Sequence, residues 1–189
     1  MGTIPPLLAA PAILPPFVGT DPATPASRSP YRVGIEDVVQ RFATSSKRVE
    51  ILKGLLSYRE ELRRLELGAE FQWLAGSFVE NPGREPRDVD VVTFYQLTPA
   101  QLADLRGDPH RWDRLQVLAQ SAKARFLCDA YLVNMAGLGG DLVAAAHYWY
   151  GLFSHQRGSL AWKGMLEVEV AIGDDDKQAE EMLAAVVIP

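Results

Sequence analysis

The sequence predicts an α+β protein in which helices pack on a small mixed β-sheet. Apolar runs with strand character occupy residues 71–75, 88–95 and 124–134, and segments with helical spacing lie before and between them. The order is helices, then a β-hairpin, then strands alternating with helices, which favours a mixed sheet covered by helices. The 189 residues suit one domain plus tails, and 48% hydrophobic residues are enough for a real core.

Two helices are expected before the first strand. Residues 35–43 have the pattern of a short helix, and residues 46–67 form a longer helix that Gly68 stops at the C′ position. Apolar residues fall on one face of the longer helix, and charged residues populate the other face. We expect this charged face to be a solvated surface rather than a binding patch. Its residues are Glu50, Arg59, Glu60, Glu61, Arg63 and Arg64.

Strands and helices alternate through the rest of the chain. Valine and phenylalanine favour a strand at residues 88–95, and residues 81–86 before it have turn composition. Thr98 opens a capping box with proline at the first helical position, and Asp108-Pro109 restarts a helix. The later elements are that helix to about residue 122, a strand at 124–134, an aromatic-rich helix at 141–153, a strand at 163–172 and a last helix to about residue 187. Acidic residues suit a helix N-terminus, so Asp174, Asp175 and Asp176 are expected to cap the last helix.

Residues 1–30 form a proline-rich, extended N-terminal leader, distinct from the domain at residues 31–189. Eight of the thirteen prolines fall in this leader, which therefore cannot form a helix or a central strand. Two interpretations stay open: a docking arm for a partner, or a segment that lies over the domain. In the second, apolar side chains fill surface grooves. These are Leu7, Leu8, Ile13, Leu14 and Phe17.

Composition limits the classes of function. The net charge of −5 gives no global basic field that would draw in nucleic acid, although a local basic groove is compatible with it. The single cysteine, Cys128, excludes an internal disulfide and a cysteine-based zinc site. No apolar run reaches the roughly 18 residues of a membrane span, and the prolines argue against a signal peptide. We expect a cytoplasmic protein that does not bind membranes.

Three acidic residues in apolar runs predict a metal site. Side chains alternate along a strand, so Asp88 and Asp90 point to the same side. Two neighbouring carboxylates repel each other unless a cation lies between them. Asp129, on a later strand, would complete a site for two Mg²⁺ ions, which prefer carboxylate and phosphate oxygens; Mn²⁺ would be able to substitute. Asp88, Asp90 and Asp129 are thus the predicted metal ligands and catalytic residues.

A glycine-serine turn beside these acids predicts phosphate binding. Gly76 allows close approach of the backbone to a triphosphate, and Ser77 offers its hydroxyl and nearby amides. Arg84, Arg87 and Lys163 are candidate phosphate ligands by position. The alternative is a structural Gly-Ser turn in which Asp88 pairs with Arg84 or Arg87.

Other residues leave two interpretations open. Lys123, Arg125 and Arg157 either contact phosphates or are solvated surface cations. The aromatic residues of the 141–153 helix either stack on a base or belong to the core. These are Tyr148, Trp149, Tyr150 and Phe153.

The strand, Gly-Ser and Asp-x-Asp pattern resembles the nucleotidyltransferase superfamily with a DNA-polymerase-β-like fold. More closely, the chain resembles a family of short bacterial nucleotidyltransferase-like proteins. The matching motifs are Leu-Pro-Pro at 14–16, Arg-Phe at 41–42, Trp-x-x-Gly-Ser-Phe at 73–78, Pro-x-Asp-x-Asp at 86–90 and Lys-Gly at 163–164. The resemblance covers residues 13–172, and its most specific part is residues 73–90.

The resemblance implies a nucleotidyltransferase fold and an enzyme that moves a nucleoside monophosphate from an NTP to a hydroxyl. The acceptor would be RNA, a protein or a small molecule, and relatives of this type suggest a toxin–antitoxin or phage-defence setting with a partner protein from a neighbouring gene. The chain departs from the larger members because no second domain that would grip a primer or tRNA is recognisable. The alternative is a catalytically silent relative that binds a partner, as an antitoxin does, or senses a nucleotide.

Overall fold

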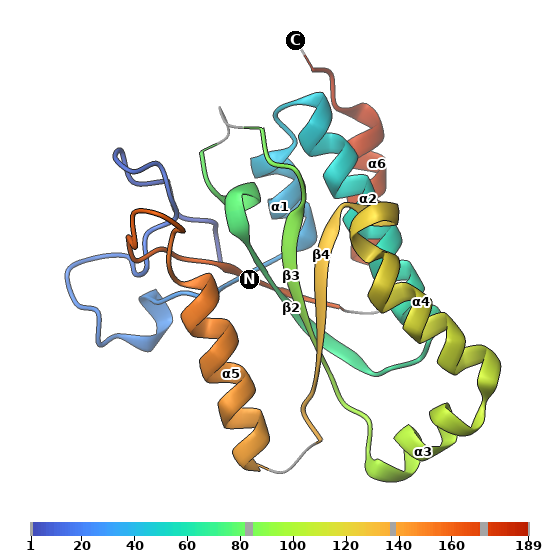
Figure 1. Ribbon diagram of the computed structural model, residues 1–189. Helices are drawn as coiled ribbons and strands as arrows, with labels where there is room; N and C mark the ends of the chain where they lie inside the picture. Colours follow the sequence, from blue (N-terminus) through green and yellow to red (C-terminus); the bar gives the residue numbers. More distant parts are fainter. Residues whose placement is uncertain (1, 82–84, 137–138, 171–173, 189) are drawn as a thin grey trace.

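The computed structural model describes residues 2–81, 85–136, 139–170 and 174–188. It confirms an α+β architecture built on a small mixed sheet, with strand order β1-β5-β2-β3-β4 (Figure 1). The strands are β1 (Tyr31–Val33), β2 (Ala69–Ala75), β3 (Val89–Tyr95), β4 (Cys128–Asn134) and β5 (Leu166–Glu169). β2 is antiparallel to β3 and β5, whereas β1 runs parallel to β5 and β3 runs parallel to β4.

Helices cover the two faces of the sheet unequally. The helices are α1 (Ile35–Phe42), α2 (Ser46–Arg64), α3 (Pro99–Gly107), α4 (Pro109–Phe126), α5 (Gly139–Phe153) and α6 (Asp174–Ala185), with short 3₁₀ turns η1 (Pro25–Ser27) and η2 (Gly76–Val79). In Figure 1, α5 stands on one side of the sheet, and α1, α2, α4 and α6 gather on the other. None of the helices in the described ranges combines the length and apolar character needed to cross a membrane.

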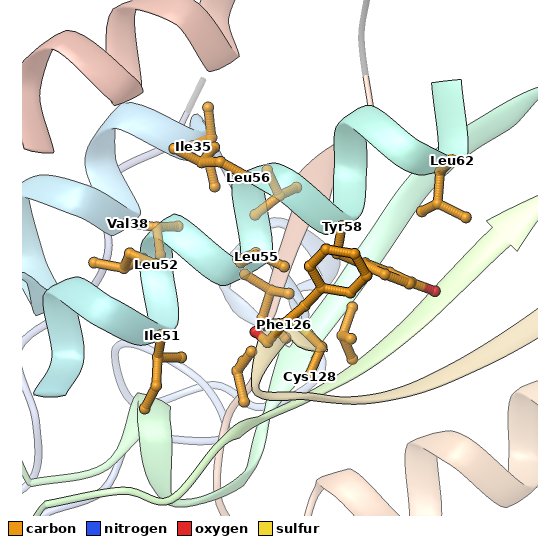
Figure 2. Close-up of a cluster of buried hydrophobic side chains, with 14 of the residues drawn as sticks. Ile35, Val38, Ile51, Leu52, Leu55, Leu56, Tyr58, Leu62, Phe126 and Cys128 are labelled. Carbon is orange, nitrogen blue, oxygen red and sulfur yellow. Dashed lines mark hydrogen bonds between the residues drawn. The ribbon is translucent and has the colours of Figure 1, made fainter. Parts of the chain in front are cut away.

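The main core lies between α2 and the sheet. Leu52, Leu55 and Leu56 of α2 are buried there, because helical spacing puts them on one face (Figure 2). Val89 and Cys128 reach the same core from β3 and β4. Since side chains alternate along a strand, the residues that follow them, at positions 90 and 129, belong to the opposite face of the sheet.

A second, smaller core lies under α5 on that opposite face. Trp73, Phe94 and Phe153 are buried in it, and Trp149 and Tyr150 are partly buried against it. Phe153 is therefore a core residue. Tyr148, in contrast, is 60% exposed. One side of α5 therefore packs in the smaller core, and another side presents Tyr148 to solvent.

Helix-start signals in the sequence predicted two helices well. Thr98 accepts a hydrogen bond from the Gln101 amide, and the Gln101 side chain accepts one from the Thr98 amide, which is the predicted capping box. Asp108 caps α4 by accepting from the His110 amide at 3.0 Å. Both helices start with proline, as expected.

Two predicted boundaries are wrong because the core decides where the helices end. α2 ends at Arg64 instead of residue 67, and both Glu66, with φ of 54°, and Gly68, with φ of 61°, take the left-handed conformation after the helix end. α4 continues to Phe126, so residues 124–126 are helical instead of the start of a strand. Phe126 follows the buried Ala122 by one helical turn, and this spacing keeps the segment helical. β5 spans Leu166–Glu169, shorter than predicted, and residues 171 and 172 lie outside the described ranges.

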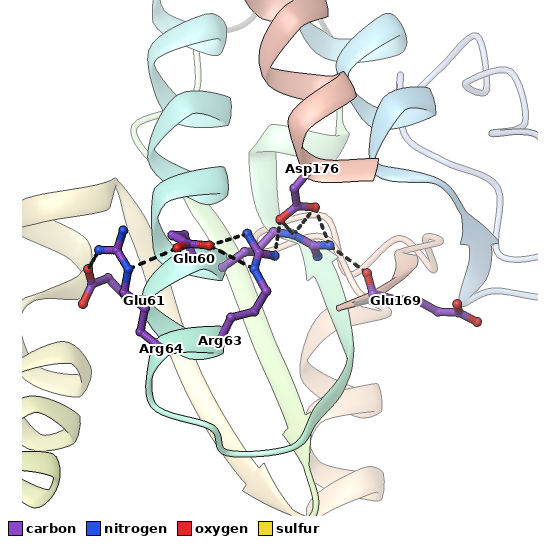
Figure 3. A network of polar contacts seen from close by, with 7 residues as sticks. Glu60, Glu61, Arg63, Arg64, Glu169 and Asp176 are labelled. Atoms are coloured by element: carbon purple, nitrogen blue, oxygen red, sulfur yellow. Dashed lines mark hydrogen bonds and ion pairs between the residues drawn. The ribbon is translucent and has the colours of Figure 1, made fainter. Parts of the chain in front are cut away.

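The charged face of α2 is only in part the solvated surface that the sequence predicted. Arg59 is only 1% exposed, and its Nη2 lies 2.8 Å from Asp176 Oδ1 of α6. Arg63 pairs with the same carboxylate at 2.6 Å, and Glu60 continues the network on the solvent side (Figure 3). Asp176 is therefore a buried partner of two arginines rather than only a cap. The pattern within α2 could not reveal this, because α6 comes more than a hundred residues later.

The N-terminal leader lies over the domain. Ile13 and Leu14 are buried, and the Leu14 carbonyl accepts a hydrogen bond from the Gly164 amide at 2.8 Å. The Pro15 carbonyl accepts one from the Tyr31 hydroxyl at 2.7 Å. Leu8, in contrast, is 41% exposed. The leader is thus held by buried side chains, among them Ile13 and Leu14, and by hydrogen bonds of its backbone to β1 and to the segment before β5.

Candidate active site

The predicted carboxylates meet at the edge of the sheet where β2 ends and β3 and β4 begin. Asp90 is the register partner of Asp129 across the parallel pair, and of Ala75 across the antiparallel pair. Asp88 immediately precedes β3. All three aspartates line one cleft with a volume of about 320 Å³. The strand alternation that buries Val89 and Cys128 on the main core side directs these acids to the other face.

The Gly76 turn lies directly against the Asp90 carboxylate. Gly76 has a φ of 76°, in the left-handed region that favours glycine. A Cβ atom at this position would collide with Asp90 Oδ2. Glycine therefore allows both the sharp turn from β2 into η2 and the close approach of the carboxylate to the backbone. Ser77 follows in η2 and also lines the cleft.

Lys123 is the cation nearest to the carboxylates. Its Nζ, from the last turn of α4, lies 2.9 Å from Asp88 Oδ2 and 2.9 Å from Asp129 Oδ2. These hydrogen bonds, first to Asp88 and then to Asp129, raise the pKa of Lys123 above its ordinary value. Asp88 therefore pairs with Lys123, whereas the structural alternative paired it with Arg84 or Arg87. Arg84 lies outside the described residues, and Arg87 lines the cleft.

Asp90 is half-buried and lines the cleft together with Asp88 and Asp129. Its burial, followed by repulsion from Asp88 and Asp129, raises the pKa of its carboxyl group above the ordinary value. Arg157 and Lys163 act in the opposite direction and lower it. The cleft is thus a place where negative charges crowd together and where added positive charge is stabilising.

The donors match magnesium chemistry, although their present arrangement does not form a metal cage. Carboxylate oxygens are the ligands that Mg²⁺ prefers, and the pocket beside Gly76 brings three carboxylates to one cleft. Within the described residues, however, no group of three or more histidine, cysteine, aspartate or glutamate side chains is arranged to hold a metal ion. The Lys123 ammonium group instead lies between Asp88 and Asp129. A divalent ion would compete with Lys123 for these oxygens.

A buried polar cluster beneath the Gly76 turn was missed by the sequence analysis. Lys163 Nζ lies 2.6 Å from Glu80 Oε1 and donates to the Gly76 carbonyl at 3.3 Å. The second oxygen of Glu80 accepts from Gln156 Nε2 at 3.0 Å. Lys163 is only 4% exposed, so it reaches the cleft as a partner of Glu80 rather than as a free cation. Nothing in the local sequence marks Glu80, because its partners lie more than seventy residues away.

An arginine of α2 supports the same turn from the core side. Arg48 is fully buried, and its Nη1 donates to the Phe78 carbonyl of η2 at 2.7 Å. Its Nη2 donates to the Asn81 carbonyl at 3.2 Å. The turn between β2 and β3 is therefore fixed by Arg48 on one side and by Lys163 on the other.

Some, but not all, of the cations considered for phosphate contact line the cleft. Arg87, Lys123 and Arg157 line it, and Lys163 lies in its wall. Arg125 does not belong to the residues that line it; its guanidinium lies 4.7 Å from the centre of the Phe126 ring. The end of α5 and the segment after it close the far wall with Leu152, Phe153, His155, Gln156 and Arg157.

Comparisons with known proteins give a family but no function. A search among curated proteins and a search among solved structures each found no match. The model of a family of unknown function, DUF6932, matches residues 7–169. This match includes part of the leader and all of the predicted site residues. The chain therefore belongs to the family of unknown function DUF6932.

Proposed function

We propose that this protein is a magnesium-dependent nucleotidyltransferase that moves a nucleoside monophosphate from an NTP to a hydroxyl acceptor. The observation that carries the proposal is the convergence of Asp88, Asp90 and Asp129 in one cleft beside the left-handed Gly76 turn. The α+β architecture with its mixed sheet is compatible with a nucleotidyltransferase fold. The fold assignment itself is part of the proposal, as is the enzymatic activity.

Each residue has a role that follows from its position. Asp88 and Asp90 would hold divalent ions on the turn side of the cleft. Asp129 is the register partner of Asp90, and its side chain is 30% exposed. Its carboxylate would therefore be able to accept the proton of the acceptor hydroxyl. When bound, Mg²⁺ would supply neutralisation of phosphate charge. Gly76, Ser77 and Arg87 would bind and orient the phosphates, and most of the rate enhancement would come from positioning and electrostatics.

The direct test is transfer of label from each of the four α-³²P-labelled NTPs in Mg²⁺ or Mn²⁺, with total cell RNA and protein as acceptors. We expect wild-type protein to label one acceptor class, and Asp88→Asn and Asp90→Asn to lose at least about a hundredfold of the rate. Asp113→Asn, an exposed acid on α4, is the matched control and should transfer normally. Undiminished transfer in Asp88→Asn or Asp90→Asn would contradict the proposed site.

The position of Lys123 favours a second candidate, a module that binds nucleotides or a partner without turnover. An ammonium group that engages two of the three acids already compensates part of their negative charge without a metal ion. If the protein is such a binding module, no acceptor is labelled in the transfer assay, and its affinity for nucleotides does not depend on Mg²⁺. Equilibrium binding of each NTP with and without Mg²⁺, run beside the transfer assay, separates the two functions. Co-purification of a partner protein without nucleotide binding would indicate the antitoxin-like version.

A further inference from the structure

Lys163 and Arg157, the two cations of the C-terminal part of the chain that line the cleft, differ in burial and in ion pairing. Lys163 is buried and paired with Glu80 at 2.6 Å. Arg157 is exposed, lines the cleft, and has no ion-pair partner among the residues that the structure describes. Lys163 would have to give up a buried pair to bind a ligand, which is costly. Arg157 would not.

The segment that carries Arg157 is fixed at its base. The Gln156 side chain donates to Glu80 Oε2 at 3.0 Å, and the Gln156 amide donates to the Ala161 carbonyl at 2.9 Å. The Lys163 amide donates to the Ser154 carbonyl at 2.7 Å, and His155 and Trp162 form a β-bridge. Residues 154–163 therefore form a closed loop rather than a loose connection, and the Gln156–Glu80–Lys163 cluster ties it to the Gly76 turn.

This anchor determines where Arg157 can act. Arg157 directly follows Gln156, whose side chain is bonded to the wall of the cleft. Arg157 lines the same cleft as Asp88, Asp90 and Asp129. A guanidinium group presents several donors that match phosphate oxygens. An anchored loop loses little conformational freedom when such a ligand binds.

We propose that Arg157 is a polyphosphate-binding residue of this cleft and that Lys163, together with Glu80 and Gln156, positions its loop. The ligand class is a linear di- or triphosphate, and its identification as the phosphate tail of an NTP rests on the proposed function. Arg87 faces the same cleft from the strand side, so a polyphosphate would lie between the two arginines. Lys163, the cation expected from the sequence to bind phosphate, would act only through the loop.

The experiment uses inorganic tripolyphosphate as the probe, titrated calorimetrically into the full chain in the presence of Mg²⁺. The variants are Arg157→Gln, Arg157→Lys and, as a matched control, Arg41→Gln, an exposed arginine of α1 that does not line the cleft. We expect Arg157→Gln to weaken binding by about tenfold, the size of one charge-assisted hydrogen bond. Arg157→Lys should recover part of the affinity because it keeps the charge but not the fork of donors. Arg41→Gln should bind like wild type.

The outcomes separate this inference from the proposed function. If wild type binds tripolyphosphate and Arg157→Gln binds it weakly, the site stands even where no nucleotide transfer is detected. In a second outcome, wild type transfers nucleotides, and Arg157→Gln keeps the wild-type KM for the NTP and the wild-type affinity for tripolyphosphate. This result would overturn the assignment of Arg157 but leave the proposed enzymatic activity intact. Absence of tripolyphosphate binding in wild type would also overturn the assignment.

Discussion

One glycine determines how closely the turn after β2 approaches the acid cluster. Gly76 is left-handed, and the Asp90 carboxylate occupies the space where a side chain would begin. Two separate costs would therefore follow from any substitution there. One is the backbone strain of a left-handed residue, and the other is the collision with the half-buried carboxyl group of Asp90.

The two costs can be measured separately by comparing two alanine variants. Gly19 is also left-handed, with a φ of 88°, but nothing lies within 4 Å of its Cβ position. We expect Gly19→Ala to lower the free energy of unfolding by about 1 kcal/mol through strain alone. Gly76→Ala should lower it by about 2–4 kcal/mol, because Asp90 or the turn must also shift. Urea denaturation measures both values. Equal losses would show that Asp90 does not press on the turn.

The residues of the site were predictable to the extent that local patterns determine them. Strand alternation predicted that Asp88 and Asp90 point to the same side, and the structure brings both of them, with Asp129, into one cleft. The partners of these acids were not predictable in the same way. Lys123 reaches them only because α4 continues to Phe126, and Glu80 is buried only because Lys163 returns to it from much later in the chain. Such long-range pairs leave no mark on the sequence around either partner.

At the scale of elements, α2 and α6 are joined through a buried carboxylate. Asp176 accepts from Arg59 and Arg63 of α2, and Arg59 also donates to the Glu169 carbonyl of β5 at 2.7 Å. Burial by itself would raise the pKa of Asp176, but the bonds to Arg59 and Arg63 outweigh it and hold that pKa below the ordinary value. The carboxylate is therefore stabilised in its charged form by folding.

Replacement of Asp176 should be strongly destabilising, and the loss should depend on pH. Asp176→Asn leaves the Arg59 charge buried without its partner, so we expect the free energy of unfolding at pH 7 to fall by about 3 kcal/mol. A depressed folded pKa contributes stability above the unfolded value of about 3.9 and loses it as the pH falls through the folded pKa. The difference between wild type and Asp176→Asn should hence shrink below about pH 4.

The neighbouring acid provides the control for this prediction. Asp175→Asn changes the same first turn of α6 without touching either arginine pair, and should cost about 0.5 kcal/mol through the helix dipole. Denaturant titrations of the three proteins between pH 3 and pH 7 provide the comparison. A pH-independent difference for Asp176→Asn would mean that its carboxylate is not selectively stabilised in the charged form.

At the scale of the whole molecule, the order of elements predicted the mixed sheet but not all of its pairings. The antiparallel pair of β2 and β3 joins two strands that follow each other in the chain, with residues 76–88 between them. The edge pair of β1 and β5 joins segments more than 130 residues apart, and β1 has only three residues, too few for a period to be recognised. Packing against the leader and the main core, rather than local propensity, selects this pairing.

The leader is the last determinant of stability at this scale, because some of its side chains are buried while others are exposed. Leu14 is fully buried in the main core, whereas Leu8 is 41% exposed. We expect Leu14→Ala to lower the free energy of unfolding by about 2–4 kcal/mol, the cost of a cavity in a core, and Leu8→Ala to change it by no more than about 0.5 kcal/mol. Urea denaturation of the full chain measures both. Similar small effects would make the leader a docking arm that only rests on the domain. A large effect at Leu14 alone would make the leader part of the fold, and the Leu14 carbonyl, which accepts a hydrogen bond from the Gly164 amide next to Lys163, would then belong to the support of the cleft wall.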